Sequence, residues 1–242
     1  MKKKQDGFGH EAPFQGETND WITPKWIIKA FDTLSDSQFF SLDPCSSLTQ
    51  PWIIARKAYT AEQNGLISPW GAGHVYCNPP YGNNVGQWAK KMAKHNDGIM
   101  LIFARVETSV WQDEIFPTAS GFLFPNRRIA FWEFVCECGK PRSWHSGSSK
   151  KKAAASCGNY RQTKDNRAVE SDAAGAPSAF VAWGDDCRAA LIELCDNGGI
   201  PGAFLDMAFY TGSYHSEEEA REARLKRDAE SDEESASPRL LL

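Results

Sequence analysis

An apolar run that ends at two consecutive prolines constrains the fold of this chain more than any other stretch. The run Val75–Cys77 reads as a buried strand, and Asn78, Pro79 and Pro80 follow it directly. Proline fixes φ and has no N–H, so a strand cannot continue through this pair. The segment therefore predicts a stiff turn that holds Asn78, the Pro79 carbonyl and the Tyr81 ring at the end of a strand.

The groups at this turn suit an amino group on a planar base. The Asn78 side-chain oxygen and the Pro79 backbone oxygen can each accept a hydrogen bond, and the Tyr81 ring can stack on the face of a base. Two acceptors that take hydrogen bonds from an amino group polarise its N–H bonds and make its nitrogen a better nucleophile. The plain alternative is a strand-ending turn without further function, because asparagine and proline are common turn residues.

Helical patterns alternate with apolar strands along most of the chain. Apolar residues at helical spacing predict helices over 25–34, 85–95, 109–116 and 185–196. Strands are expected at 39–42, within 52–61, and at 99–103, 121–124, 128–132 and 179–183. Thr23 is the expected N-cap of the first helix, with Pro24 as its first residue. This order predicts an α/β domain with a largely parallel sheet.

Composition divides the chain into a domain and three other segments. Residues 1–19 are polar and are expected to be mobile, and residues 20–212 form the predicted domain. Within it, 136–175 is rich in Lys, Ser, Gly and Ala and is expected to be a mobile insertion. Residues 213–242 form a charged tail that accounts for the whole net charge of −4. The neutral remainder neither supports nor excludes DNA binding.

The seven cysteines are scattered, and no apolar run approaches the length of a membrane span. The basic N-terminus is not followed by an apolar segment, so a reduced, cytoplasmic protein is expected. Cys136, Cys138, His145 and Cys157 can be interpreted as zinc ligands. Their spacing is not a pair of Cys-x-x-Cys motifs, and Ser and Lys dominate the interval. Free cysteines in a flexible loop, without metal, are the favoured interpretation.

Three further stretches occur around the Asn-Pro-Pro-Tyr motif in a defined order. They are Trp21-Ile22-Thr23-Pro24, Leu42-Asp43-Pro44-Cys45, and Arg105-Val106-Glu107-Thr108 followed by Trp111. Together with the central motif, they resemble the phage-type DNA adenine-N6 methyltransferases, the Dam-like prophage family. The resemblance covers roughly 20–132 and resumes at 175–183.

The resemblance implies a Rossmann-like sheet that binds S-adenosylmethionine, and methyl transfer to the N6 amino group of a flipped adenine in DNA, which is expected to be double-stranded. It also implies a bacterial host cell. The implied catalytic residues are Asn78, Pro79, Pro80 and Tyr81. The implied cofactor-binding residues are Thr23, Pro24, Asp43, Pro44, Cys45 and Asn64.

Asn64 departs from the family pattern. Members tend to have Asp-Gly-Leu where this chain has Asn64-Gly65-Leu66. The aspartate is expected to contact the adenine amino group of the cofactor, and Asn64 keeps an acceptor oxygen but loses the charge. We therefore expect an effect on cofactor affinity rather than on activity.

Asp43 and Thr23 are expected to serve the two ends of the cofactor's methionine part. Asp43 follows a strand at the carboxyl edge of the sheet, where ligands gather in α/β proteins, and its carboxylate suits the ammonium group. Thr23 lies at a helix start, where a hydroxyl and unpaired N–H groups suit the carboxylate.

No separate domain for recognising a DNA sequence is expected, so the sequence should be read by loops such as 105–108, 126–128 or the basic insertion. The expected DNA-binding residues are Arg105, Arg127, Arg128, Lys150, Lys151 and Lys152. The lysine run should contact phosphates rather than base edges.

Two other functions use the same features. A methyltransferase acting on RNA or on protein glutamine would carry the same central motif. A DNA-binding accessory protein with an inactive site is the alternative from a different class, although the intact Asn-Pro-Pro-Tyr motif argues against it.

Overall fold

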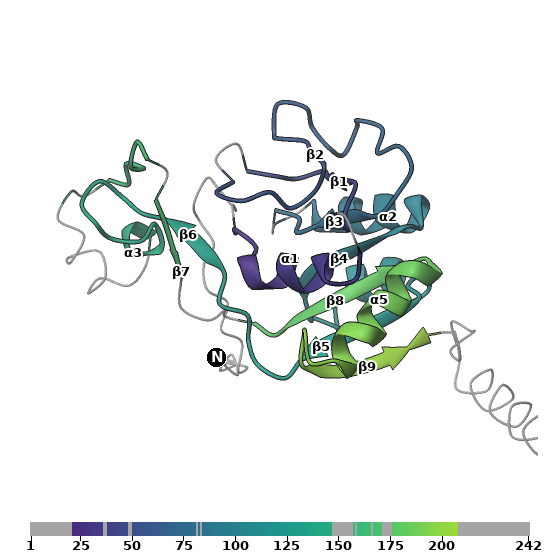
Figure 1. Cartoon of the computed structure of the whole chain (residues 1–242). Helices are drawn as coiled ribbons and strands as arrows, with labels where there is room; N and C mark the ends of the chain where they lie inside the picture. Colours follow the sequence, from purple (N-terminus) through teal and green to yellow (C-terminus); the bar gives the residue numbers. More distant parts are fainter. Residues whose placement is uncertain are drawn as a thin grey trace, which may run out of the picture. The chain divides into compact units, whose positions relative to one another are not determined.

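The computed structural model describes residues 21–35, 38–47, 50–80, 82, 84–146, 157, 159–165, 167–170 and 176–207. A sheet of seven strands forms its centre, in the spatial order β2-β1-β3-β4-β8-β5-β9 (Figure 1). In that order the strands are Lys57–Ala58, Leu42–Asp43, Val75–Cys77, Gly98–Phe103, Ser178–Trp183, Gly121–Pro125 and Gly202–Asp206.

Five of these strands point in one direction. β2, β1, β3 and β4 pair in parallel, and β8 is antiparallel to both β4 and β5, so β5 runs the same way as β4. β9 is antiparallel to β5. The predicted α/β fold with a largely parallel sheet is confirmed. The carboxyl ends of β2, β1, β3, β4 and β5 all lie at one edge of the sheet, where α/β proteins place their ligand sites.

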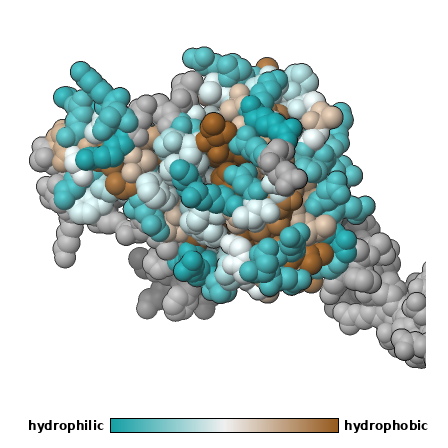
Figure 2. Space-filling view, viewed as in Figure 1, coloured by the Kyte–Doolittle hydropathy of each residue, from teal (hydrophilic) through white to brown (hydrophobic). Residues whose placement is uncertain are grey.

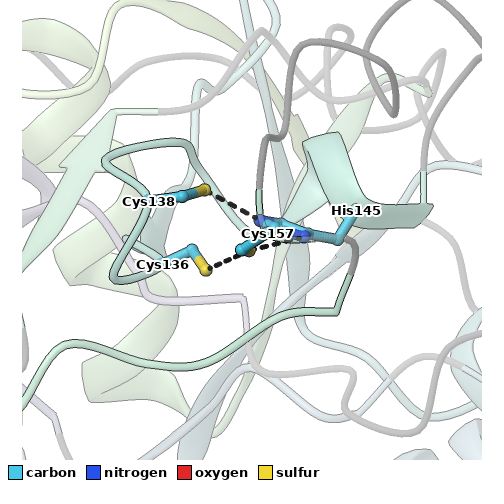
Figure 3. Close-up of side chains that lie close together, drawn as sticks. All are labelled: Cys136, Cys138, His145 and Cys157. Atoms are coloured by element: carbon cyan, nitrogen blue, oxygen red, sulfur yellow. Dashed lines mark hydrogen bonds between the residues drawn. The ribbon is translucent and has the colours of Figure 1, made fainter.

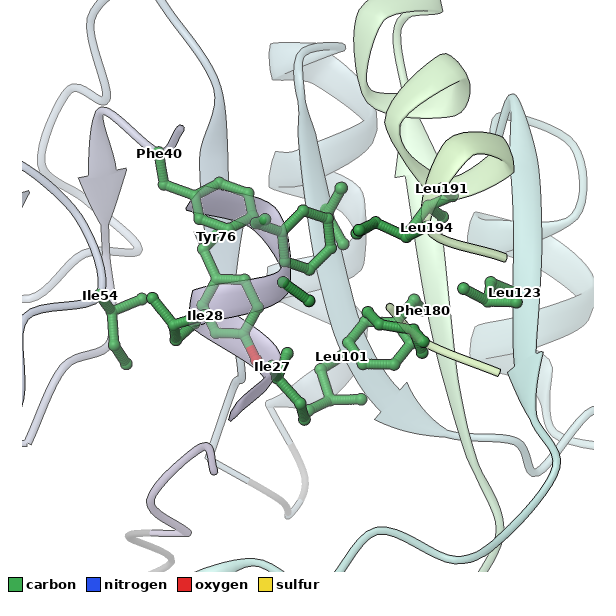
Figure 4. Close-up of a cluster of buried hydrophobic side chains, with 14 of the residues drawn as sticks. Ile27, Ile28, Phe40, Ile54, Tyr76, Leu101, Leu123, Phe180, Leu191 and Leu194 are labelled. Atoms are coloured by element: carbon green, nitrogen blue, oxygen red, sulfur yellow. The ribbon is translucent and has the colours of Figure 1, made fainter. Parts of the chain in front are cut away.

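Alternating residues of the central strands pack into two separate cores. On β4, for example, Ile99 and Leu101 belong to one core and Met100 and Ile102 to the other. Helices α1 (Lys25–Asp32) and α5 (Asp185–Asp196) cover the first face, which is drawn in Figure 4. Helix α2 (Val85–His95) and the π-helix η1 (Val110–Ile115) cover the second. The continuous apolar runs in the sequence thus reflect strands buried on both faces.

Apolar side chains are concentrated in these two cores. Figure 2 shows mainly hydrophilic residues on the face that it draws, with apolar residues in smaller patches. The exposed large apolar side chains among the described residues are Trp26, Ile53, Ile67, Val106 and Leu205. None of the helices in the described ranges is both long enough and apolar enough to cross a membrane.

Several local predictions were wrong at the ends of elements. The residue at the N-cap position of α1 is Pro24, with φ −56° and ψ 136°, and Thr23 does not cap the helix. The strand expected at 128–132 begins only at Trp132, as β6 (Trp132–Phe134). β9 was not predicted: three of its five residues are exposed and none is buried, so its sequence contains no buried apolar run.

The described part of 136–175 contains secondary structure that the sequence did not predict. β7 (Ala168–Glu170) pairs antiparallel with β6 to form a two-stranded sheet, and a short helix, α3 (Ser143–Ser146), follows a tight turn (Figure 1). Predictions for 1–19 and 213–242 fall outside the described residues.

Candidate active site

A cavity of about 300 Å³ opens at the carboxyl edge of the sheet. This volume is at the lower end of the range for small-molecule sites. Predicted site residues that line it are Thr23, Asp43, Pro44, Cys45, Asn64, Asn78 and Pro80. Pro24 and Pro79 are buried but do not line the cavity, and Tyr81 lies outside the described residues. Residues from four segments that are distant in the sequence thus surround one space.

The Asn78 side chain is held in one orientation by the start of the described chain. Its Nδ2 donates hydrogen bonds to the Trp21 carbonyl oxygen at 2.7 Å and to Thr23 Oγ1 at 3.3 Å. Thr23 Oγ1 in turn lies 3.0 Å from the hydroxyl oxygen of buried Tyr76. Because the NH₂ group faces Trp21 and Thr23, the carboxamide oxygen has a defined direction.

This network gives Thr23 contacts that the sequence did not predict. Its hydroxyl lies between Tyr76 and Asn78 and orients the central amide. Sequence reasoning missed Tyr76, whose apolar strand context hides the use of its hydroxyl. The role of Thr23 toward a cofactor carboxylate stays a prediction.

Asp43 is a buried carboxyl group at the end of β1, with 4% of its surface exposed. Its Oδ1 accepts a hydrogen bond from the Cys45 backbone N–H at 3.1 Å. Burial raises the pKa of Asp43 to about 7, although hydrogen bonds from Cys45 and Ser46 act to lower it. Within the described ranges, no ion pair involves Asp43. A cation bound in the cavity would therefore provide the counter-charge for the Asp43 carboxylate and favour its ionised form.

The Cys45 thiol connects the two strand ends. It donates a hydrogen bond to the Asn78 carbonyl oxygen at 3.2 Å and lies 3.7 Å from Cys77 Sγ. Burial and the adjacent Cys77 thiol raise the pKa of Cys45 well above its ordinary value of 9.0. The thiol therefore stays protonated at neutral pH and serves as a hydrogen-bond donor, not as a nucleophile.

The loop that contains Asn64 packs closely on the Asp43 turn. Asn64 has a positive φ of 47°, and its Oδ1 accepts a hydrogen bond from the Leu66 N–H at 3.2 Å. A Cβ on Gly65 would lie only 1.9 Å from the Pro44 carbonyl oxygen. Glycine is therefore required where this loop contacts Pro44.

Lys91 of α2 binds the backbone of the loop that contains Asn64. Its Nζ donates to the carbonyl oxygens of Gly65, Leu66 and Ser68 at 2.8, 2.8 and 2.6 Å. Burial lowers the pKa of Lys91 below its ordinary value of 10.5. Sequence reasoning missed this residue, since a lysine on the polar side of a helix gives no signal of such a role.

Substituting Gly65 with alanine is expected to weaken cofactor binding at least tenfold, because the new methyl group displaces either the loop or the Asp43 turn. Calorimetric titration with S-adenosylmethionine measures the effect. Gly86→Ala is the matched control, since its Cβ would meet Val110 Cγ2 at an ordinary 3.4 Å. Unchanged affinity in Gly65→Ala would separate this loop from the cofactor site.

Three of the predicted DNA-binding residues follow strands at the same edge. Arg105 comes after β4, and Arg127 and Arg128 come after β5, and all three are exposed. The edge that holds Asn78 therefore also carries positive charge. Lys150, Lys151 and Lys152 lie outside the described residues.

A parallel-core α/β sheet with an Asn-Pro-Pro turn at its carboxyl edge is the arrangement expected of an amino-methyltransferase. The family model described as DNA N-6-adenine-methyltransferase (Dam) matches residues 13–169. The match spans more than half of the chain, so the chain belongs to the Dam family and is a DNA N6-adenine methyltransferase. Searches of the curated proteins and of the solved structures found no match.

The family assignment confirms the predicted enzyme class, and it implies DNA as the substrate. Dam-family methyltransferases use S-adenosylmethionine. The cavity fits such a cofactor in one respect: Asp43, which lines it, is a buried carboxyl group without an ion pair among the described residues and suits the cofactor's ammonium group. The phage-type origin and the cytoplasmic location stay predictions.

Proposed function

We propose that Asn78 and Pro79 bind the N6 amino group of an adenine that has rotated out of the DNA helix, with Tyr81 stacking on its face. N6 cannot be reached in line while the base is stacked, so enzymes of this kind must extrude it. The single observation that carries the proposal is the fixed Asn78 amide, whose Nδ2 is bound to Trp21 and Thr23. A hydrogen-bond acceptor held in a fixed direction is suited to the N–H groups of a planar amino group, which also point in fixed directions.

In this proposal, catalysis comes from positioning and polarisation. S-adenosylmethionine, when bound, supplies a methyl group on a positively charged sulfur. Asn78 Oδ1 and the Pro79 carbonyl oxygen accept hydrogen bonds from the two N6 hydrogens and direct the nitrogen lone pair toward that methyl group. As the N–C bond forms, the S–C bond would break with its electron pair remaining on sulfur, and N6 would lose one proton to solvent water. No covalent enzyme intermediate is needed, which agrees with a Cys45 thiol that stays protonated.

Asp43 binds the cofactor's ammonium group, and the Asn64 loop binds its adenine end. Pro44 and Cys45 form the turn next to Asp43. Pro24 borders the segment of Trp21 and Thr23, and Pro80 borders the segment of Asn78, and both segments line the cavity. Arg105, Arg127 and Arg128 bind the phosphates of double-stranded DNA beside the extruded base. Their exposure at the same sheet edge as Asn78 supports this assignment.

Base extrusion can be tested with 2-aminopurine, a fluorescent adenine analogue that neighbouring bases quench. Sequencing of DNA from cells that express the protein first identifies the methylated adenine. A duplex with 2-aminopurine at that position should gain fluorescence severalfold on binding the protein. The Tyr81→Ala variant should give a larger increase, because its binding pocket lacks the quenching ring.

A duplex with 2-aminopurine at a neighbouring, unmethylated position is the control and should not respond. Methylation of the mapped adenine without any fluorescence gain at that position would contradict base extrusion while leaving the enzyme's activity established.

A further inference from the structure

Four side chains outside the active site converge on one point beside the β6–β7 sheet. Cys136, Cys138, His145 and Cys157 each offer one ligand atom, and these atoms all lie within 4.8 Å of one another (Figure 3). We propose that they bind a single structural Zn²⁺ ion. Nothing in the proposed catalytic chemistry uses these residues.

The spacing of the ligand atoms matches a tetrahedral zinc site. The Sγ atoms of Cys136 and Cys157 are 3.4 Å apart, Cys138 Sγ is 3.7 Å from His145 Nε2, and Cys157 Sγ is 3.9 Å from His145 Nδ1. Zn–S bonds of about 2.3 Å and Zn–N bonds of about 2.0–2.1 Å at tetrahedral angles give ligand separations of roughly 3.8 Å for S···S and roughly 3.6 Å for S···N. One ring nitrogen of His145 is enough to complete the set.

The backbone around Cys136 forms a tight turn that presents two sulfurs on one side. Gly139 N–H donates to the Cys136 carbonyl oxygen at 2.8 Å, and Gly139 has a positive φ of 80° that suits only glycine without strain. The Arg161 N–H donates to Cys136 Sγ at 3.2 Å. Such a bond to a ligand sulfur orients it and stabilises its thiolate form.

His145 is positioned by a buried carboxylate. Glu133 of β6, 6% exposed, accepts hydrogen bonds from both the backbone N–H and the hydroxyl of Ser143, at 2.7 and 2.8 Å. These bonds fix the start of α3, which carries His145. The Tyr160 ring packs edge-on against the His145 ring, with centroids 5.7 Å apart. The histidine is therefore oriented by residues from both sides of the cluster.

The ligand set indicates both the metal and its role. Three thiolates and an imidazole favour zinc over calcium or magnesium, which prefer oxygen ligands. Four protein ligands leave no open coordination position, which is typical of a structural site. A two-stranded sheet with little core of its own is the kind of segment that a metal stabilises.

Sequence reasoning favoured free cysteines because the intervals between the ligands are not those of a known zinc motif. In the structure, the bridge between Cys136 and Gln162 and the β6–β7 pairing bring the ends of a long segment together. A disulfide between Cys136 and Cys157 is the competing outcome, and it would leave Cys138 and His145 without a shared role.

The full chain, purified without chelator, should contain one equivalent of zinc by mass spectrometry of the metal. Cys138→Ser and His145→Gln should each lose most of it. Cys195→Ser, in helix α5 and outside the cluster, is the matched control and should retain the full equivalent. Zinc retained equally by Cys138→Ser and the control would overturn the site.

Two measurements on the unaltered chain keep the proposal testable if the variants do not fold. Exchange with Co²⁺ should produce the thiolate-to-cobalt charge-transfer absorption of a tetrahedral site. After denaturation in chelator without reductant, all seven cysteines should titrate as thiols. Loss of two thiols would indicate the disulfide and overturn the proposal, as would absence of both zinc and the cobalt absorption.

Discussion

The Asn78→Ala variant is expected to lower the turnover number for DNA methylation by about two to three orders of magnitude. A polarising hydrogen bond in a site that excludes water contributes roughly 3–4 kcal/mol to transition-state stabilisation. Affinity for S-adenosylmethionine should change little, because Asp43 is hydrogen-bonded to Cys45 and Asn64 to Leu66, whereas the Asn78 side chain donates to Trp21 and Thr23. Single-turnover methylation with saturating cofactor measures the chemical step directly.

The Asn78→Asp variant separates the role of the Oδ1 acceptor from that of the Nδ2 donor, which binds Trp21 and Thr23. Aspartate keeps an acceptor oxygen but cannot donate to the Trp21 carbonyl as Nδ2 does. If the acceptor is what matters, Asn78→Asp should retain more turnover than Asn78→Ala. Near-normal turnover in the alanine variant would show that the central assignment is wrong. Equal losses in both variants would make Asn78 an anchor for Trp21 and Thr23.

Asp43→Ala is expected to raise the dissociation constant for S-adenosylmethionine about tenfold or more. A hydrogen bond to a charged group contributes roughly 1.5–3 kcal/mol, and each 1.4 kcal/mol is a factor of ten in affinity. Binding of DNA without cofactor should be nearly unchanged. Calorimetric titrations with S-adenosylmethionine alone and with DNA alone measure the two affinities separately. Unchanged affinity for the cofactor would show that Asp43 is not part of its site.

The raised pKa of Asp43 gives the same prediction a pH dependence. The carboxyl group titrates at about 7 in the folded protein, against 3.8 for an ordinary aspartate. Cofactor affinity should therefore increase as pH rises through 7, with release of a proton on binding below that pH. The folded state holds this proton more tightly than the unfolded state, so the stability that Asp43 contributes is fully present below about pH 4 and is lost as pH rises toward 7.

Asp43→Asn removes this titration and serves as the control. It should raise the free energy of unfolding of the cofactor-free protein at pH 8, by at most about 4 kcal/mol, the equivalent of the full pKa shift. Thermal unfolding at pH 5 and pH 8 measures it. If Asp43 binds the cofactor's ammonium group as proposed, its carboxyl group is retained for function at a cost in stability.

The sequence predicted the fold where apolar patterns are long. The helices over 85–95 and 185–196 were predicted with their observed ends, and the buried strand at 99–103 differs by one residue. Short strands were less well predicted, since β1 and β2 contain two residues each and depend on pairing with neighbours rather than on their own pattern.

In the candidate site, too, residues with a local sequence signal were predicted and residues that depend on distant contacts were not. Asp43 and Asn78 were predicted because a turn residue after a strand leaves a local signal. Lys91 and Tyr76 were missed because their roles depend on contacts between distant segments. The convergence of Cys136 and Cys157 likewise needs the β6–β7 pairing, which the polar composition of 136–175 conceals.

The backbone pairing between Ile22 and Trp132 affects when the enzyme becomes competent. Each residue donates its N–H to the carbonyl oxygen of the other, at 3.1 and 3.0 Å, and the flanking Trp21 and Thr23 hold the Asn78 amide. Trp132 is synthesised after both Asp43 and Asn78, and a contact over a long loop forms late because loop closure costs entropy. During synthesis, the turn that carries Asp43 can thus assemble before the Asn78 amide is oriented. With Asp43 and Asn78 in the roles proposed above, a nascent chain would acquire affinity for the methyl donor before the ability to modify DNA.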